Sequence, residues 1–163
     1  MLQAQGSVKC LAAIGSTIGL LAAVTAPIAA ADDRTRVPMP GVFKRCDFSA
    51  NTYVPAAGNG RALALISSGQ QQVVAEVELL TAKPNMHYTA RLIQTPRQSL
   101  ACSAGDPGVT AASLNTDAFG AASVVLRAPI LSGTTGAWVF IDRPAEYSQT
   151  PAESYTSYFI AKV

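Results

Sequence analysis

Apolar and polar residues alternate most clearly over residues 72–80, which read QVVAEVELL. In an extended chain, successive side chains point to opposite faces, so this pattern predicts a half-buried strand. One face would carry two carboxylates, Glu76 and Glu78, and a helix would place them on different sides instead. The opposite face would carry Val73, Ala75, Val77 and Leu79.

Turn signals divide the rest of the chain after residue 41 into further short strands. Pro, Gly, Asn and Asp cluster between the apolar runs, and no segment shows a helical period. About eight short strands at near-regular spacing predict an all-β fold, either a β-sandwich or a small barrel. Its core should contain Trp138, Phe140, Phe159 and the valine face of residues 72–80. The predicted strands are 42–48, 61–67, 72–80, 86–94, 109–115, 122–128, 137–142 and 155–163.

Residues 1–31 have the organisation of a secretory signal peptide. A short segment with the cation Lys9 precedes an uncharged apolar run over 10–24, and small residues at 29–31 offer a cleavage site. An uncleaved membrane anchor is the alternative, but a spanning helix needs about 20 strongly apolar residues. A lipid anchor would need a cysteine at the end of the apolar run, whereas Cys10 stands at its start. We expect cleavage after Ala31, export through the Sec pathway, and a secreted or cell-wall-associated protein without a membrane span.

Cleavage would leave 132 of the 163 residues, enough for one domain with a real core. Residues 32–41 are polar with two prolines and predict a flexible arm, so the sandwich would occupy 42–163. Without Lys9, the 12 basic residues become 11 against 10 acidic residues, a net charge of +1. The basic residues are scattered, which does not favour nucleic-acid binding.

Two cysteines remain after cleavage, Cys46 and Cys102. An even pair in an exported chain predicts a disulfide. The bridge would close a loop of 56 positions, worth roughly 4 kcal/mol in the chain-entropy model. A redox or metal-binding pair is the alternative, but it lacks CxxC spacing and an accompanying histidine cluster.

Residues 114–141 read LNTDAFGAASVVLRAPILSGTTGAWVFI. This stretch resembles small exported proteins of mycobacteria and related actinobacteria, which are largely uncharacterised. The alanine-rich signal peptide fits the same origin. It implies an Ig-like sandwich and export, and it provides no catalytic residues. The residues that carry it are Asn115, Thr116, Asp117, Ala118, Gly120 and Trp138.

Catalytic chemistry has few candidates in this chain. His87 is the single histidine, it lies inside a predicted strand, and no G-x-S-x-G motif accompanies it. Met86, His87 and Met39 together would make a poor copper site, so we expect no metal and no cofactor. Glu76 and Glu78 share a strand face at a spacing that could serve glycoside hydrolysis, although solubility is the usual role of such residues.

Two long polar loops, 95–108 and 143–154, remain as candidate recognition elements. Loops on a rigid scaffold often bind partners, and Arg and Tyr are favoured at binding hot spots. The sequence therefore predicts a secreted, non-enzymatic binding or structural module of the cell envelope or extracellular space. Its partner would be an envelope glycan or protein. The alternatives are a carboxylate-dependent hydrolase acting on envelope glycan and a purely structural surface protein. The candidate binding residues are Arg97, Gln98, Arg143, Glu146 and Tyr147.

Overall fold

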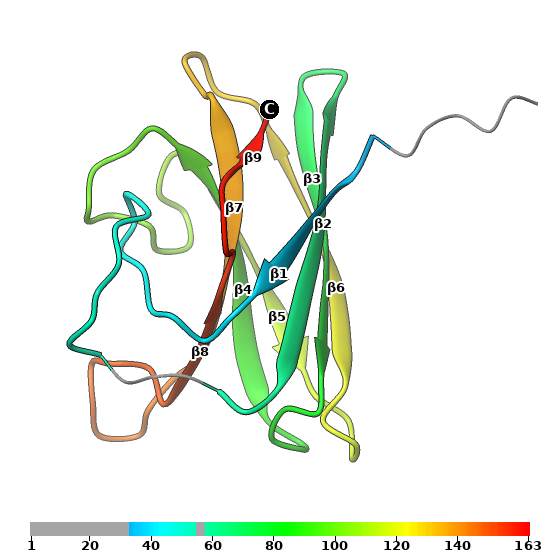
Figure 1. Cartoon of the computed structure of the whole chain (residues 1–163), viewed down its shortest axis with the longest axis vertical. Coiled ribbons are helices and arrows are strands. Elements are labelled where there is room, and N and C mark those ends of the chain that lie inside the picture. The colour runs from blue at the N-terminus through cyan, green and yellow to red at the C-terminus, as the bar shows by residue number, and fades with distance from the viewer. Residues whose placement is uncertain (1–32, 55–57) are drawn as a thin grey trace, which may run out of the picture. The chain divides into compact units, whose positions relative to one another are not determined.

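Two antiparallel sheets packed face to face form the fold (Figure 1). The computed structural model describes residues 33–54 and 58–163, so the predicted signal peptide lies outside the described residues. One sheet has the strand order β1-β2-β3-β6, and the other has the order β5-β4-β7-β8, with β9 also paired to β7. The strands are β1 (Thr35–Met39), β2 (Arg61–Gly69), β3 (Gln72–Leu80), β4 (His87–Thr95), β5 (Val109–Asn115), β6 (Ala122–Pro129), β7 (Gly136–Arg143), β8 (Glu153–Thr156) and β9 (Ala161–Lys162).

The connectivity follows the immunoglobulin order. Strands β2-β3-β6 take the places of A, B and E, and strands β5-β4-β7-β8 take those of C′, C, F and G. Strand β1 extends the first sheet beside β2. The prediction of an all-β sandwich with one disulfide is confirmed, and the described residues contain no helix.

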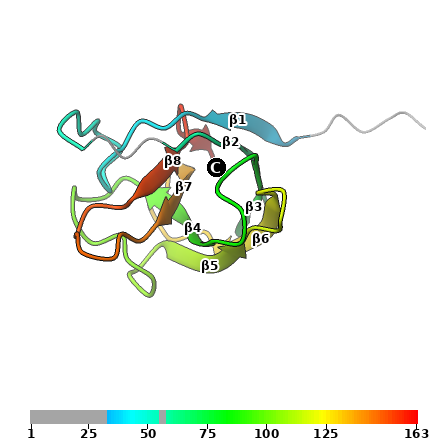
Figure 2. The same cartoon turned by 90° about the horizontal axis from the view of Figure 1, so that it is seen from below.

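The main core lies between the sheets (Figure 2). The alternation predicted for residues 72–80 is present in β3, whose side chains at 73, 75, 77 and 79 are buried against the other sheet. Strand β4 contributes Tyr88, Ala90 and Leu92, all fully buried. Every second residue of these strands therefore leaves water, and this burial is the main force that holds the two sheets together.

The sandwich begins earlier than predicted, because part of the expected flexible arm is a strand. Residues Thr35–Met39 form β1, which pairs with β2 and buries Val37 and Met39. Pro38 is compatible with this strand because β1 lies at the sheet edge, where one residue without an N–H group is tolerated. The prediction of a loose arm over 32–41 is wrong for these five residues.

Two other predicted strands differ from the structure. Residues 42–48 form a loop closed on itself, with the single bridge Lys44–Ala50, and Phe48 has a φ of 71°. The predicted last strand, 155–163, is divided into β8 and β9 by residues 157–160. Phe159 lies in this interruption and is 39% exposed, so its predicted place in the core is wrong.

A second, smaller apolar cluster lies on the outer face of the five-stranded sheet. Trp138 and Phe140 point away from the main core and pack with Ile93 and Val109. The ring of Phe48 lies 5.3 Å from that of Trp138, and Phe43 lies 5.6 Å from Phe140. The loops 40–54 and 96–108, called here the loop cover, thus shield this sheet face from water, as the left side of Figure 1 shows.

The predicted disulfide is present and joins the two halves of the loop cover. Cys46 and Cys102 have Cα atoms 5.5 Å apart and are separated by 56 positions. The backbone N–H of Cys46 also donates to the carbonyl of Ser99. The bridge therefore secures the cover over one sheet and does not cross the main core, unlike the inter-sheet bridge of antibody domains.

Candidate functional site

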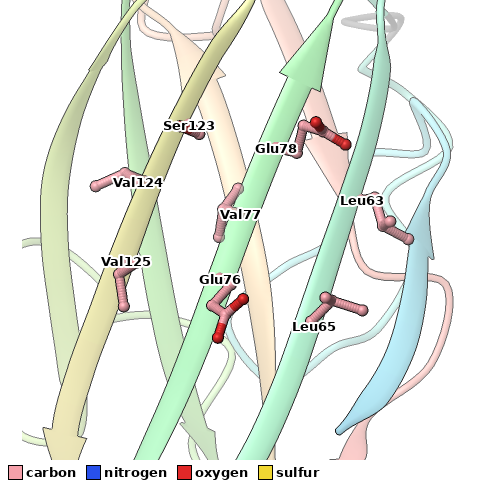
Figure 3. A pocket seen from close by; sticks show the side chains of 8 residues that line it. All are labelled: Leu63, Leu65, Glu76, Val77, Glu78, Ser123, Val124 and Val125. Atoms are coloured by element: carbon pink, nitrogen blue, oxygen red, sulfur yellow. The ribbon is translucent and has the colours of Figure 1, made fainter.

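The outer face of the five-stranded sheet is covered, whereas the outer face of the four-stranded sheet carries an open hollow of about 480 Å³ (Figure 3). Cross-strand pairing builds the hollow from two rows of side chains. Leu63, Glu78 and Ser123 lie side by side in one row, and Leu65, Glu76 and Val125 form the next. Figure 3 shows these side chains on three adjacent strands, with the carboxylates in the middle. We call these six residues the open face.

Strand periodicity explains how the open face arises. In β2, Ala64 and Ile66 fill the core, so Leu63 and Leu65 must point outward. In β6, Leu126 is buried and Val125 is 49% exposed for the same reason. Over residues 63–66 and 124–126 these strands are apolar on both faces. Such a pattern is expected when both sides of a sheet are covered, yet the described chain covers one.

The two carboxylates of the open face have different environments. Glu76 accepts a hydrogen bond from Arg34 at 3.1 Å, and the two side chains are 45% and 39% exposed. An exposed pair of this kind contributes at most about 1 kcal/mol. Within the described ranges the side chain of Glu78 forms neither an ion pair nor a hydrogen bond. Its carboxylate therefore lies between Leu63 and Ser123 without a partner of its own.

The predicted loop residues do not come together in one place. Arg97 and Gln98 follow the end of β4, which pairs with Gly136 at the start of β7. Arg143 stands at the end of β7, seven residues or roughly 23 Å further along the strand at about 3.3 Å per residue. The two loops that were expected to offer recognition elements therefore lie in two separate regions.

Arg143 belongs to a closed polar network at its end of the sandwich. The carboxylate of Glu153 accepts hydrogen bonds from Arg143 at 2.9 Å, from the Tyr88 hydroxyl at 2.7 Å and from the Tyr155 hydroxyl at 3.3 Å. Tyr155 in turn accepts a hydrogen bond from the N–H of Gly60. Burial, and then the neighbouring Glu153, raise the pKa values of both tyrosines. These side chains satisfy one another, which is a structural role.

The other residues of the second loop are exposed. The Tyr147 hydroxyl donates to Glu146 at 2.6 Å, and Tyr147 is 91% exposed. This hydrogen bond, and to a smaller extent desolvation, raise the pKa of Tyr147. Both side chains are exposed to a partner, and neither belongs to an apolar cluster of the described residues.

His87 has a hydrogen-bond partner but no catalytic environment. It is exposed on β4, and its Nδ1 lies 2.8 Å from the side-chain oxygen of Asn115. The nearby Asp142 pairs with Arg91 at 2.8 Å. Burial raises the pKa of Asp142, and Arg91 opposes that shift. Met39 is only 4% exposed, inside the main core, so it is not available to a copper site with His87.

Residues 33–54 and 58–163 contain no cluster of three or more metal-ligating side chains. The same part of the chain has no helix of the length and hydropathy that a membrane crossing requires. Comparisons with protein-family models, with curated proteins and with solved structures find no match to this chain.

Sequence reasoning identified Glu76 and Glu78 as neighbours on one strand face but missed the apolar residues beside them. A signal was present, because residues 63–66 read LALI and residues 124–126 read VVL. Apolar residues at both the odd and the even positions of a strand predict that both of its faces are buried. That pattern could have identified the outward residues of β2 and β6 as candidates for a contact surface.

Proposed function

We propose that this protein is an exported, non-enzymatic binding module of the cell envelope or extracellular space, and that the open face contacts another protein. Export is supported by the signal-peptide pattern of residues 1–31 and by a disulfide, which is compatible with an oxidising environment. The resemblance to small exported actinobacterial proteins agrees with this proposal and stays a prediction.

The observation that carries the proposal is the unequal covering of the two sheets. The five-stranded sheet has aromatic side chains and the loop cover over its outer face, while the four-stranded sheet presents leucine and valine side chains around an open hollow. Leu63 and Leu65 are half-buried and Val125 is 49% exposed, with the two glutamates between them. Apolar side chains gathered on one uncovered sheet face favour a site of interaction. The open face has the composition of a sheet surface that another molecule covers.

The chemistry of the hollow favours a protein partner over a glycan. Its walls are mostly aliphatic, with two carboxylates and the hydroxyl of Ser123. Covering sugar hydroxyls with Leu65 and Val125 would leave them without hydrogen bonds, at a cost in free energy. A protein that presents a lysine or arginine among aliphatic side chains would satisfy Glu78 and bury Leu65 together. We therefore infer a partner with a basic and aliphatic surface.

The same geometry gives little support to hydrolysis. Glycosidases hold one carboxyl protonated by shielding it from water. The Glu76 side chain is 45% exposed and is engaged with Arg34. A binding role uses these two carboxylates in their exposed positions, since charges across an interface provide specificity more than affinity.

A pair of synthetic peptides tests the proposal. We expect the chain without residues 1–31 to bind a fluorescent peptide of alternating leucine and lysine, and not its leucine and glutamate counterpart, in an anisotropy titration. Glu78→Lys should weaken binding of the lysine peptide at least tenfold, and Leu65→Ser should weaken it several-fold. The matched control is Leu100→Ser, because Leu100 is 76% exposed and lies outside the open face. Binding that is equal for both peptides, or unchanged in both open-face variants, would refute the proposal.

Purified cell-wall polymer separates the remaining alternatives. We expect the polymer to be neither cut nor retained through the open face. Cleavage that is lost in Glu76→Gln and Glu78→Gln would establish the hydrolase and overturn the proposal. Retention that is lost in Leu65→Ser would identify a glycan as the ligand of this face and would overturn the inference of a protein partner.

A further inference from the structure

A second cavity lies between the loop that follows β4 and the turn that joins β6 to β7. It has a volume of about 280 Å³ and is separate from the open face. The inference drawn from it does not depend on the proposed function. Its lining combines a guanidinium with apolar walls and small polar groups: Arg97, Pro96, Pro107, Leu131, Ser132 and Thr134.

Arg97 is the charged group of this cavity, and most of its donors have no partner. One terminal nitrogen, Nη2, donates to the carbonyl of Ala101. The Nε atom is buried and has no hydrogen-bond partner in the structure. Among the described residues no carboxylate forms an ion pair with Arg97. A partly buried guanidinium in this state is costly unless an anion joins it.

The nearest acidic residue only partly compensates this charge. Asp106 uses one carboxylate oxygen to accept a hydrogen bond from the N–H of Ser103 at 2.7 Å. Burial lowers the pKa of Arg97, and the negative charge of Asp106 acts against that shift. Because Asp106 acts on this site by electrostatics, it repels any anionic ligand, and it repels a ligand with two negative charges about twice as strongly as one with a single charge.

The walls of the cavity are held in place by their own hydrogen bonds. The side chain of Gln94 is buried; its nitrogen donates to the carbonyl of Pro129 at 2.9 Å. Its oxygen accepts from the N–H of Leu131 at 3.0 Å and from the hydroxyl of Thr134 at 2.8 Å. Cys102 secures the loop on the other side through the disulfide. The cavity is therefore formed before any ligand arrives, which lowers the entropic cost of binding.

Gly108 keeps the space beside the guanidinium open. A Cβ atom at this position would lie 3.9 Å from Nη1 of Arg97, 3.4 Å from Gln94 and 3.3 Å from Leu131. The φ of Gly108 is +73°, a backbone conformation that glycine adopts readily. The Nη1 end of Arg97 therefore borders the cavity where the backbone carries no side chain.

We propose that this cavity binds a monoanionic carboxylate, which the guanidinium of Arg97 holds by charge-assisted hydrogen bonds. Arginine matches the geometry of a carboxylate, and such bonds are about twice as strong as neutral ones. The volume lies just below the usual range for small-molecule pockets, about 300–1,000 Å³, so it fits a short chain. Pro96, Pro107 and Leu131 would contact the aliphatic part. The ligand is either a small free carboxylic acid or the C-terminal residue of a peptide.

Nuclear magnetic resonance titration of the isotope-labelled chain without residues 1–31 tests this assignment. We expect acetate and propionate to shift the amide signals around Arg97, Gly108 and Ser132 with saturation in the millimolar range, and phosphate to act at least tenfold more weakly. N-acetyl-dialanine with a free C-terminus, compared with its amide, separates the two sources. If the free peptide acid saturates the site, the ligand is the C-terminal end of a peptide. If propionate binds and the free peptide acid does not, the ligand is a small carboxylic acid.

Variants make the test specific for Arg97. We expect Arg97→Gln to weaken propionate at least tenfold, while Arg127→Gln, which removes an exposed cation from β6, leaves the affinity unchanged. Ser132→Asp places a carboxylate at the exposed rim and should weaken propionate similarly. It serves as the deciding variant if Arg97→Gln does not fold. Equal response to phosphate and propionate, or undiminished affinity in the deciding variant, would overturn the proposal.

Discussion

Replacing both Cys46 and Cys102 with alanine tests whether one bridge secures the loop cover on the five-stranded sheet. Trp138 is fully buried beneath this cover and contacts the ring of Phe48. It is the single tryptophan of the chain, so its fluorescence reports on the cover alone. Far-ultraviolet circular dichroism reports on both sheets. The two signals together separate a loosened cover from global unfolding.

The expected loss of stability follows from the length of the closed loop. A separation of 56 positions gives roughly 4 kcal/mol in the chain-entropy model. Weakening of one edge-to-face ring contact in the cover would add about 0.5–1.5 kcal/mol. The sum, about 5 kcal/mol, is a large part of the 5–15 kcal/mol that stabilises a typical domain.

Urea unfolding measures this loss. With a typical m value of about 2 kcal/mol/M, the midpoint should fall by roughly 2.5 M. We also expect the Trp138 emission of the folded variant to shift to longer wavelength, while the β-sheet signal is retained. Unmodified protein treated with a reductant should reproduce both effects. A loss below about 1 kcal/mol with unchanged emission would refute the role assigned to the bridge.

Three further changes probe the core, a turn and the tyrosine network. Leu126→Ala should cost about 2–5 kcal/mol in urea unfolding, because Leu126 is 1% exposed between the sheets. Gly120→Ala should lower the melting temperature, because Gly120 has a φ of +75° and an added Cβ would lie 2.1 Å from the carbonyl oxygen of Ala82. The control Phe119→Ala lies on the same turn, where Phe119 is 84% exposed, and should change stability by less than about 0.5 kcal/mol. The pKa values of Tyr88 and Tyr155 are raised by burial, so the folded state holds their protons more tightly than the unfolded state, in which the pKa is about 10. The resulting stability is fully present below pH 10 and should decline above it. Tyr88→Phe should reduce this decline. Urea midpoints that are equal at pH 9 and pH 11 would contradict the raised pKa values of the two tyrosines.

The sandwich and its bridge could be predicted because their signals are local. Alternation in residues 72–80 determines which side chains of β3 face the core. The turn residues around Gly120 mark the end of one strand and the start of the next, but β5 and β6 lie in different sheets and do not pair as a hairpin. Two cysteines in the exported chain allow only one disulfide pairing. Each inference needs only the spacing of nearby residues or the count of a residue type, so no knowledge of distant contacts is required.

The remainder depends on distant partners, which a single sequence does not reveal. Thr35–Met39 reads as a proline-rich arm, and it becomes a strand because β2 offers a free edge. Phe159 is as apolar as Phe140, yet it is exposed in the interruption between β8 and β9. Whether Leu63 and Leu65 are covered is likewise decided by where the long loops lie, and those loops cover the other sheet.

The distribution of aromatic side chains explains why the long loops cover one sheet and leave Leu63 and Leu65 uncovered on the other. Trp138 and Phe140 were expected in the core and are buried, but they stand on the outer face of β7, where Phe43 and Phe48 cover them. Loops that bury their own side chains in this way have little freedom to adapt to a partner. Accessible loop residues such as Tyr147 belong to no described apolar cluster. Leu65 and Val125, by contrast, line an open hollow on a packed sheet. An apolar contact surface on the described chain is therefore to be sought on the rigid strands β2, β3 and β6, opposite the loops that usually perform this role in immunoglobulin-like domains.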